Sequence, residues 1–335
     1  MTNHVVSLTE ETITRIAVLD DWQRIAQRST DWVVLMARAD VVFFDTAFAS
    51  EDDAAEKLAD FDILMAMRER TAFPASLVRR LAKLQMLAMT GHRAASIDTA
   101  ALIGQGVTVC YTGAADHGEG TAELALGLML AAVRRIPCGD AAIRGGRFQQ
   151  GVGVGFMLAG KTLGVIGLGR LGSLMARYGQ ALGMHLLAWS QNLTAQKAAA
   201  VGAALVSKEE LLSRSDVVSL HLVLSERTRS LIGAADLARM KPGAVLVNTS
   251  RGPIVDEAAL VAEVQSGRVI AALDVYDQEP LPANHALRTA PNTVLTPHLG
   301  FGTAENFAEF YRQSVENVLA FMDGKPIRVL EMPKP

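Results

Sequence analysis

The chain has 335 residues, of which half are apolar, a fifth are charged and only 5% are aromatic, and its formal net charge is −3. One hydrophobic core rarely grows beyond about 250–300 residues, so this length predicts two domains. The apolar content excludes global disorder, and the lack of a basic surplus or of stacking aromatics argues against a nucleic-acid partner.

No segment of the sequence predicts a membrane protein or a secreted one. The longest apolar stretch, Leu124–Val133, is far shorter than the roughly 20 residues that a membrane span requires. The first residues lack the apolar segment of a signal peptide. Cys110 and Cys138 form neither a disulfide framework nor a metal-ligand cluster. We therefore expect a cytoplasmic α/β protein with no membrane partner and no metal.

Short apolar runs alternate with amphipathic stretches through the first third of the chain. We expect strands at Ile13–Leu19, Ala39–Phe44, Ile63–Met67, Gln85–Met89 and Val107–Tyr111, and helices at Glu51–Leu58, Pro74–Leu84 and Thr99–Ile103. Alternation of strands and helices is typical of a parallel sheet with crossover helices.

The alternation of short strands and helices is then interrupted by one long helix and a loop, after which it resumes. One long helix is predicted from Gly120 to Arg144, and the glycines between Gly145 and Gly155 predict a loop. The second series of strands is expected at Leu163–Ile166, Met184–Trp189, Val217–Leu222, Ala244–Asn248, Val269–Asp274 and Thr293–Leu295. A final helix spans Glu305–Met322 and ends before Gly324. Two such series imply two doubly wound parallel-sheet domains.

A glycine fingerprint marks the beginning of the second series. Gly167-Leu168-Gly169-Arg170-Leu171-Gly172 follows an apolar strand and precedes a helix expected at Ser173–Ala181. In this context the first glycine makes a tight turn, the second lets the backbone approach a pyrophosphate, and the third packs the helix on the strand. We favour a dinucleotide site here over a tight turn with a purely structural role.

The choice between NAD and NADP stays open. The strand after the fingerprint ends at Trp189-Ser190, whereas an acid at this position would bond the ribose hydroxyls and select NAD. With serine at position 190, this strand end has no carboxylate to repel the 2′-phosphate of NADP. No arginine follows at once, although Arg170 lies in the fingerprint itself. The sequence therefore permits NADP without requiring it.

Further motifs follow the fingerprint in a fixed order. They are Val247-Asn248-Thr249-Ser250-Arg251-Gly252, Leu273-Asp274-Val275 leading to Gln278-Glu279-Pro280, and Leu295-Thr296-Pro297-His298-Leu299-Gly300. With Gly160-Lys161-Thr162-Leu163-Gly164 before the fingerprint, the chain resembles the D-isomer-specific 2-hydroxyacid dehydrogenases, which include phosphoglycerate dehydrogenase and glyoxylate/hydroxypyruvate reductase. The resemblance is close from about Gly118 to Gly302.

The resemblance implies an architecture as well as an activity. It implies two Rossmann-like or flavodoxin-like domains with the active site in the cleft between them. Residues 1–115 and 303–335 would form the substrate domain, and residues 116–302 the NAD(P)-binding domain. It also implies a homodimer to which the apolar helix from Gly120 contributes.

Reduction of a 2-oxo acid needs a hydride, a proton and a cation for the carboxylate, and the motifs offer side chains for the last two. His298 is the candidate proton donor, because imidazole titrates near neutral pH. Glu279 would bond the other ring nitrogen, and Arg251 offers a fork of donors that matches a carboxylate. By resemblance these three are the family's catalytic residues.

The same resemblance implies a set of cofactor contacts, and Asp274 matches the acid at the nicotinamide end. The predicted cofactor-binding residues are Gly167, Gly169, Arg170, Leu171, Gly172, Ser190, His221, Thr228, Thr249, Arg251, Asp274, His298 and Gly300. For His221 we expect a positional role.

The substrate loop departs from the family pattern. Family members carry Gly-x-Gly-x-Asp-Asn-x-Asp after the fourth strand, whereas this chain reads Gly91-His92-Arg93 at its start. Gly91, His92, Arg93 and Arg251 are the predicted substrate-binding residues. Arg93 would favour a substrate with a second anionic group if it faces the cleft, and would be an ordinary surface residue if it points away.

Two other functions occur on the fold that the resemblance implies. Formate dehydrogenases carry glutamine at the position of Glu279, so the carboxylate argues against that activity. A dinucleotide-sensing binding protein, as in transcriptional corepressors, can keep all three catalytic residues and is not excluded by them. We favour an enzyme that acts on a small 2-oxo or 2-hydroxy acid, whose identity the sequence does not specify.

Overall fold

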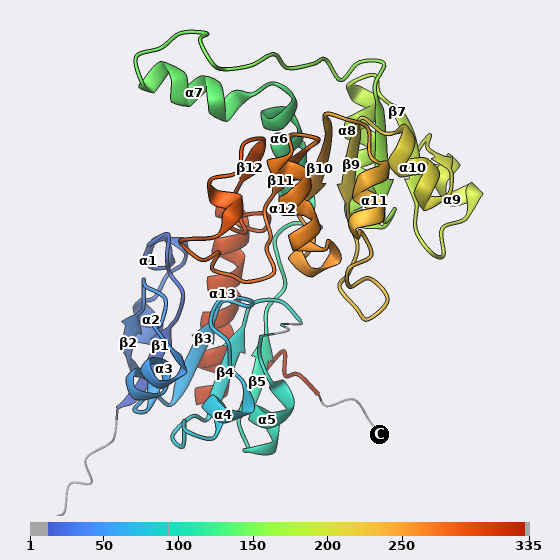
Figure 1. Ribbon diagram of the computed structural model, residues 1–335. Helices are drawn as coiled ribbons and strands as arrows, with labels where there is room; N and C mark the ends of the chain where they lie inside the picture. Colours follow the sequence, from blue (N-terminus) through green and yellow to red (C-terminus); the bar gives the residue numbers. More distant parts are fainter. Residues whose placement is uncertain (1–12, 93, 95, 332–335) are drawn as a thin grey trace, which may run out of the picture. The chain divides into compact units, whose positions relative to one another are not determined.

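The computed structural model describes residues 13–92, 94 and 96–331, and these form two compact units (Figure 1). Unit 1 comprises residues 1–115 and 304–335, and unit 2 comprises residues 116–303. Each unit is built on its own parallel sheet, as predicted from the two series of strands. Arg93, predicted to bind substrate, lies outside the described residues.

Unit 1 holds a five-stranded sheet in the order β2-β1-β3-β4-β5, and its paired strands are all parallel. Its strands are β1 (Thr14–Val18), β2 (Ala39–Phe43), β3 (Ile63–Ala66), β4 (Met86–Met89) and β5 (Thr108–Tyr111). Of the three inner strands, β3 and β4 are buried throughout, which explains why they read as continuous apolar runs rather than as alternating ones.

The helices of unit 1 are short except for the last. They are α1 (Ala26–Ser29), α2 (Val33–Met36), α3 (Glu51–Leu58), α4 (Ala75–Val78), α5 (Thr99–Gly104) and α13 (Ala304–Met322). The predicted helix Pro74–Leu84 is wrong beyond Val78. Beyond that residue the backbone forms turns in which an amide bonds the carbonyl three residues earlier, as Leu81 does to Val78 and Leu84 to Leu81. These turns bring Leu81 and Leu84 into the core.

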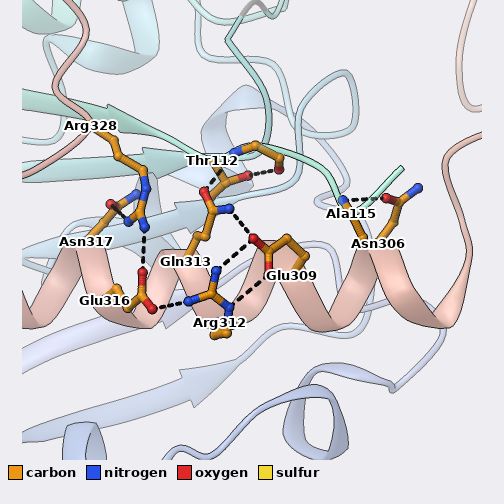
Figure 2. A network of polar contacts seen from close by, with 10 residues as sticks. Thr112, Ala115, Asn306, Glu309, Arg312, Gln313, Glu316, Asn317 and Arg328 are labelled. Carbon is orange, nitrogen blue, oxygen red and sulfur yellow. Dashed lines mark hydrogen bonds and ion pairs between the residues drawn. The ribbon is translucent and has the colours of Figure 1, made fainter. Parts of the chain in front are cut away.

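Helix α13 joins unit 1 through buried amide side chains (Figure 2). Asn306 and Gln313 accept hydrogen bonds from the amides of Ala115 and Gly113, at 3.0 and 2.8 Å, and Asn317 donates to the carbonyl of Tyr111 at 2.9 Å. Tyr111 is the last residue of β5, an edge strand of the sheet, and Gly113 and Ala115 follow it. The helix therefore supplies the hydrogen bonds that the sheet does not.

Unit 2 holds a seven-stranded sheet in the order β12-β11-β10-β9-β6-β7-β8, again with parallel pairs. Its strands are β6 (Thr162–Ile166), β7 (His185–Trp189), β8 (Ala204–Leu205), β9 (Val217–Leu220), β10 (Ala244–Asn248), β11 (Val269–Leu273) and β12 (Thr293–Leu295). Successive residues of β10 face opposite cores: Val245 and Val247 lie in one apolar cluster and Leu246 in the other. The sheet is thus covered on both faces.

Unit 2 has seven α-helices among its described residues. They are α6 (Glu119–Val133), α7 (Ile136–Arg144), α8 (Arg170–Ala181), α9 (Ala195–Ala199), α10 (Lys208–Arg214), α11 (Ala234–Arg239) and α12 (Glu257–Gln265), with the 3-10 turns η1 (Gly252–Ile254) and η2 (Ala286–Arg288). Among the described residues, none of the helices combines the length and the apolar character needed to cross a bilayer.

The single helix predicted from Gly120 to Arg144 is wrong, because α6 and α7 are separate. Arg135 adopts a left-handed conformation with φ +55°, and its Nη1 donates to Oδ1 of Asn292 at 2.9 Å. Pro137 stands in the first turn of α7, where a missing amide hydrogen is tolerated. Figure 1 shows α7 apart from the sheet of its own unit.

Candidate functional site

The predicted site residues of unit 2 follow the carboxyl ends of its parallel strands. The fingerprint follows β6, Ser190 follows β7, His221 follows β9, Thr249 and Arg251 follow β10, Asp274 follows β11 and His298 follows β12. Since parallel strands place these ends at one edge of a sheet, the fold gathers all of them there, and this edge is where open α/β sheets bind ligands.

His298 and Glu279 form a close pair. The Nδ1 of His298 lies 2.5 Å from Oε2 of Glu279, and each side chain is 23% exposed. The other carboxylate oxygen accepts the amide of Tyr276 at 2.9 Å. A carboxylate is an acceptor, so Nδ1 carries the hydrogen in this pair and Nε2 is the ring nitrogen left for another group.

Asp274 fixes the backbone that carries His298. Its Oδ1 accepts from the Thr296 hydroxyl at 2.6 Å and from the amide of Leu299 at 2.7 Å, and its Oδ2 accepts from the amide of Gly300 at 2.9 Å. Burial raises the pKa of this carboxyl, and the three hydrogen bonds act in the opposite direction. His298 itself has φ +53°, so the loop holds it in a left-handed conformation.

The turn that carries Arg251 is tied to its neighbours on both sides. Asn248 accepts the amide of Ser250 and donates to the carbonyl of Arg251, both at 3.0 Å, while the Ser250 hydroxyl donates to the carbonyl of Leu220 at 2.7 Å. A Cβ on Gly252 would lie 2.0 Å from the carbonyl carbon of Tyr276. Only glycine fits there, so the chain after Arg251 lies directly against the segment that leads to Glu279.

The fingerprint glycines divide into two kinds. A Cβ on Gly167, which has φ +95°, would lie 2.4 Å from the carbonyl oxygen of His221, and one on Gly172 would lie 2.1 Å from that of Gly167. These two are required by the protein's own packing. A Cβ on Gly169 would meet nothing within 4 Å, so this glycine keeps open space before the first turn of α8, as a bound pyrophosphate requires.

Two buried polar atoms at this edge have no hydrogen-bond partner among the described residues, namely Nδ1 of His221 and Oγ1 of Thr249. They follow the adjacent strands β9 and β10. The Nε2 of His221 is bonded to Ser219 Oγ at 2.9 Å. Buried polar atoms in proteins normally have partners, and the polar groups of a dinucleotide would supply them. The residues present thus fit this cofactor.

We predict that His221 makes stability sensitive to acid. Burial lowers the pKa of its imidazole from 6.5 to about 4. Between these values the unfolded chain binds more protons than the folded one, so stability is lost as the pH falls from 6.5 towards 4. From pH 7 to pH 5 the loss is about 2 kcal/mol.

Urea denaturation of the wild type and of His221→Asn at both pH values measures this loss. The variant should lose about 2 kcal/mol less than the wild type over this interval. An identical pH dependence in both proteins would contradict the prediction.

Three other predicted cofactor residues lie after the strands β6, β7 and β9. Trp189, just before Ser190, accepts the amide of Gly167 at 2.9 Å, which places Ser190 beside the glycine turn. Arg170 is exposed at the start of α8. The Thr228 hydroxyl donates to the carbonyl of Val223 at 2.7 Å and so organises the loop after β9.

The described part of the predicted substrate loop lies in unit 1, after β4. Gly91 has φ +75°, and a Cβ there would lie 2.4 Å from Nη1 of Arg68. The ring of His92 lies 3.7 Å from that of Tyr111, measured between centroids. Arg68, which follows β3, is a cation beside this loop that the sequence did not single out.

The sequence also does not reveal several residues that support the site through hydrogen bonds. Thr296, Asn248 and Ser250 belong to motifs that were recognised, but their roles depend on hydrogen bonds that the sequence does not show. Glu257 and His285 pair at 3.0 Å and carry no sequence signal beyond an acid in the first turn of a helix. Within the described residues no cluster of three or more metal-binding side chains is found.

Comparison with known proteins identifies the family. Residues 126–300 match the model of the D-isomer specific 2-hydroxyacid dehydrogenase NAD binding domain. A glyoxylate reductase of Aeropyrum pernix is 42% identical over 215 residues, covering 62% of this chain and 64% of that protein. A D-3-phosphoglycerate dehydrogenase of Archaeoglobus fulgidus is 35% identical over 263 residues, covering 78% and 50%. The chain thus spans less than two thirds of the length of these two relatives.

A solved structure extends the similarity to nearly the whole chain. The phosphoglycerate oxidoreductase of Vibrio cholerae superimposes with a TM-score of 0.88 at 35% identity, covering 93% of this chain and all of that one. The matched family model spans more than half of the chain. The chain therefore belongs to the D-isomer specific 2-hydroxyacid dehydrogenase family, and residues 126–300 are its NAD-binding domain.

Proposed function

We propose that this protein is an NAD(P)-dependent dehydrogenase that interconverts a small 2-oxo acid and the corresponding D-2-hydroxy acid. The observation that carries the proposal is the pair of His298 and Glu279 at 2.5 Å, set on the ligand-binding edge of an NAD-binding domain. A dinucleotide-sensing corepressor can keep the same pair, so turnover of a 2-oxo acid is what separates the two functions.

His298 is the proposed acid and base of the reaction. When bound, the nicotinamide cofactor supplies the hydride for reduction or accepts it in oxidation. Reduction of the carbonyl also needs one proton on its oxygen, and Nε2 of His298 gives that proton, while Nδ1–H stays bonded to Glu279. In the oxidation direction the same nitrogen takes the hydroxyl proton. Glu279 orients the ring through its bond to Nδ1.

Arg251 is the proposed partner of the substrate carboxylate. Its guanidinium has a fork of donors, one of which is bonded to the carbonyl of Ser250 at 2.7 Å. That bond directs the side chain, and the planar fork of N–H donors matches the geometry of a carboxylate. We also propose that Gly91, His92 and Arg93 contact the substrate, and that unit 1 is the substrate domain.

Steady-state kinetics with a panel of 2-oxo acids tests the activity. Glyoxylate, hydroxypyruvate, pyruvate, longer 2-oxo acids and phosphorylated ones should be assayed with each reduced cofactor. We expect at least one member to be reduced with kcat/KM above about 10⁴ M⁻¹ s⁻¹, the lower end of ordinary enzymes. Tight binding of NADH without reduction of any member would favour the sensing function instead.

Ser190 gives a prediction about cofactor choice. No carboxylate stands at this strand end, so NADP should be accepted at least as well as NAD. Ser190→Asp should move the preference towards NAD at least tenfold, because the new carboxylate bonds the ribose diol and repels a 2′-phosphate. Tenfold corresponds to about 1.4 kcal/mol.

The measurement is kcat/KM for both cofactors in the wild type and in Ser190→Asp. Asp replacing the neighbouring exposed residue Gln191 is the control for a general charge effect. If the wild type already rejects NADP strongly, a residue other than Ser190 reads the ribose.

We further propose a homodimer formed through α7 and the segment after it. Large apolar side chains are exposed there, among them Phe148 at 69%, Val154 at 95% and Met157 at 76%. Such a concentration of apolar surface is typical of an interface, and the mass of the protein in solution is its direct test.

Cys110 and Cys138 are both unpaired, which fits the reducing environment of the cytoplasm.

A further inference from the structure

Glu279 lies in a segment without regular secondary structure. Residues 274–285, between β11 and η2, form neither helix nor strand. A catalytic carboxylate must hold its position to within a few tenths of an ångström, and no backbone ladder does so here. The bonds that other side chains make to this segment therefore help to determine where Glu279 stands, together with the amide of Tyr276 and the packing of Gly252 against Tyr276.

Glu257, the first residue of α12, binds this segment at two points. One carboxylate oxygen, Oε2, accepts the amide of Asp277 at 3.2 Å, and the other, Oε1, pairs with Nε2 of His285 at 3.0 Å. Asp277 lies two residues before Glu279 and His285 lies six residues after it. The side chains of Glu257 and His285 are each 21% exposed, so their pair is partly shielded from water, whereas the bond to the amide of Asp277 is exposed.

The tautomer of His285 follows from its second contact. Its Nδ1 accepts the amide of Leu287 at 3.3 Å, so Nε2 carries the hydrogen and donates to Glu257. The neutral ring thus satisfies both bonds. Arg288, three residues beyond His285, also holds this segment, because it donates to the carbonyls of Leu281 and Pro282, at 2.6 and 2.8 Å.

We propose that Glu257 is a positioning residue for Glu279, and that it acts by holding both ends of the 277–285 segment, with His285 as its partner. The proposal rests on the function assigned to the Glu279 and His298 pair. Glu257 has no part in proton transfer. It restricts the segment so that the Glu279 carboxylate meets Nδ1 of His298.

Replacement of Glu257 by alanine is the first test. A displacement of about 1 Å at a reacting group costs on the order of 100-fold, so Glu257→Ala should lower kcat about 10- to 100-fold and change KM less than threefold. Glu257→Gln keeps a single acceptor oxygen, which can serve Asp277 but not the Nε2–H of His285 as well, so it should fall between alanine and the wild type. A loss confined to KM, or equal activity of both variants and wild type, would overturn the proposal.

Glu263→Ala is the matched control. Glu263 lies on the same helix and is likewise 21% exposed, and it pairs with Arg268 at 2.6 Å, away from the 277–285 segment. This variant should lose stability through its broken ion pair and keep the wild-type kcat. If Glu263→Ala lowers kcat as much as Glu257→Ala does, the effect belongs to α12 in general and the proposal is wrong.

A double-mutant cycle separates this proposal from the proposed function. In the Glu279→Gln background, Glu257→Ala should lower kcat by less than twofold, because the carboxylate that it positions is gone. The same fold-loss in both backgrounds would refute the positioning role. If Glu279→Gln alone has wild-type turnover and an unchanged pH–rate profile, the proposed function fails instead, whatever Glu257 does.

A proton NMR spectrum supplies a readout that does not depend on turnover. The Nδ1–H of His298, bonded to Glu279 at 2.5 Å, should give a resonance far downfield in the wild type and in Glu263→Ala. In Glu257→Ala and Glu257→Gln it should move upfield or broaden. An unchanged resonance in a folded Glu257 variant would overturn the proposal.

Discussion

His298→Asn should lower kcat about 10²–10⁴-fold, the contribution typical of a general acid, and leave cofactor affinity nearly unchanged. Asparagine is the suitable replacement because residue 298 has φ +53°, a conformation that asparagine tolerates better than alanine. The variant loses the ring whose Nδ1 is bonded to Glu279 and with it the nitrogen that would face the substrate oxygen.

The measurement is kcat on the best substrate of the panel, together with the dissociation constant of the reduced cofactor. His185→Asn is the control, since His185 is an exposed histidine of the same unit at the start of β7. Near-wild-type turnover of His298→Asn, with the control unchanged, would remove His298 from its assigned role.

The second large effect is expected at Arg251. Arg251→Ala removes two charge-assisted hydrogen bonds to the substrate carboxylate and should lower kcat/KM about 10²–10³-fold. Arg251→Lys keeps the charge and loses the planar fork, so it should recover only part of that loss and should raise KM as well as lower kcat.

Arg239→Lys is the control for arginine replacement, because Arg239 is an exposed residue of α11 that bonds only the carbonyl of Ala235 among the contacts described for it. Stability of all three variants should stay close to that of the wild type. Full efficiency of Arg251→Lys would mean that the charge alone matters and that the bidentate geometry assigned to Arg251 is wrong.

The strands were predictable because parallel strands buried on both faces leave a plain sequence signal. Val245, Leu246 and Val247 are all buried and read as one apolar run bounded by a turn and a polar motif. The position of the candidate site residues was also predictable wherever they follow such a run directly, since the carboxyl end of a parallel strand determines the edge of the sheet at which they lie.

The break between α6 and α7 illustrates what local sequence did not reveal. Leucine, methionine and alanine before Arg134 favour helix, and so do Ala141 and Ala142 after it, so the prediction continued one helix across the break. The left-handed Arg135 is held by Asn292, which lies 157 residues away. Pro137 was the one local signal, because a proline inside a helical pattern marks a boundary before it.

The support of Glu279 is likewise a matter of distant contacts. Glu257 and His285 are 28 residues apart, and Asp274 meets the Thr296 hydroxyl 22 residues on. Motifs identify which side chains carry the chemistry. They do not show which neighbours hold those side chains in place, because that depends on how loops from different strands meet.

Transfer of deuterium tests the central claim most directly. Reduced cofactor labelled with deuterium at the transferring position of nicotinamide C4 is incubated with the protein and the best 2-oxo acid of the panel. The product is then resolved by chiral chromatography and mass spectrometry. We predict a 2-hydroxy acid of D configuration with one deuterium on C2. An L product, a product without deuterium, or no reduction of any 2-oxo acid in the panel would contradict the assignment.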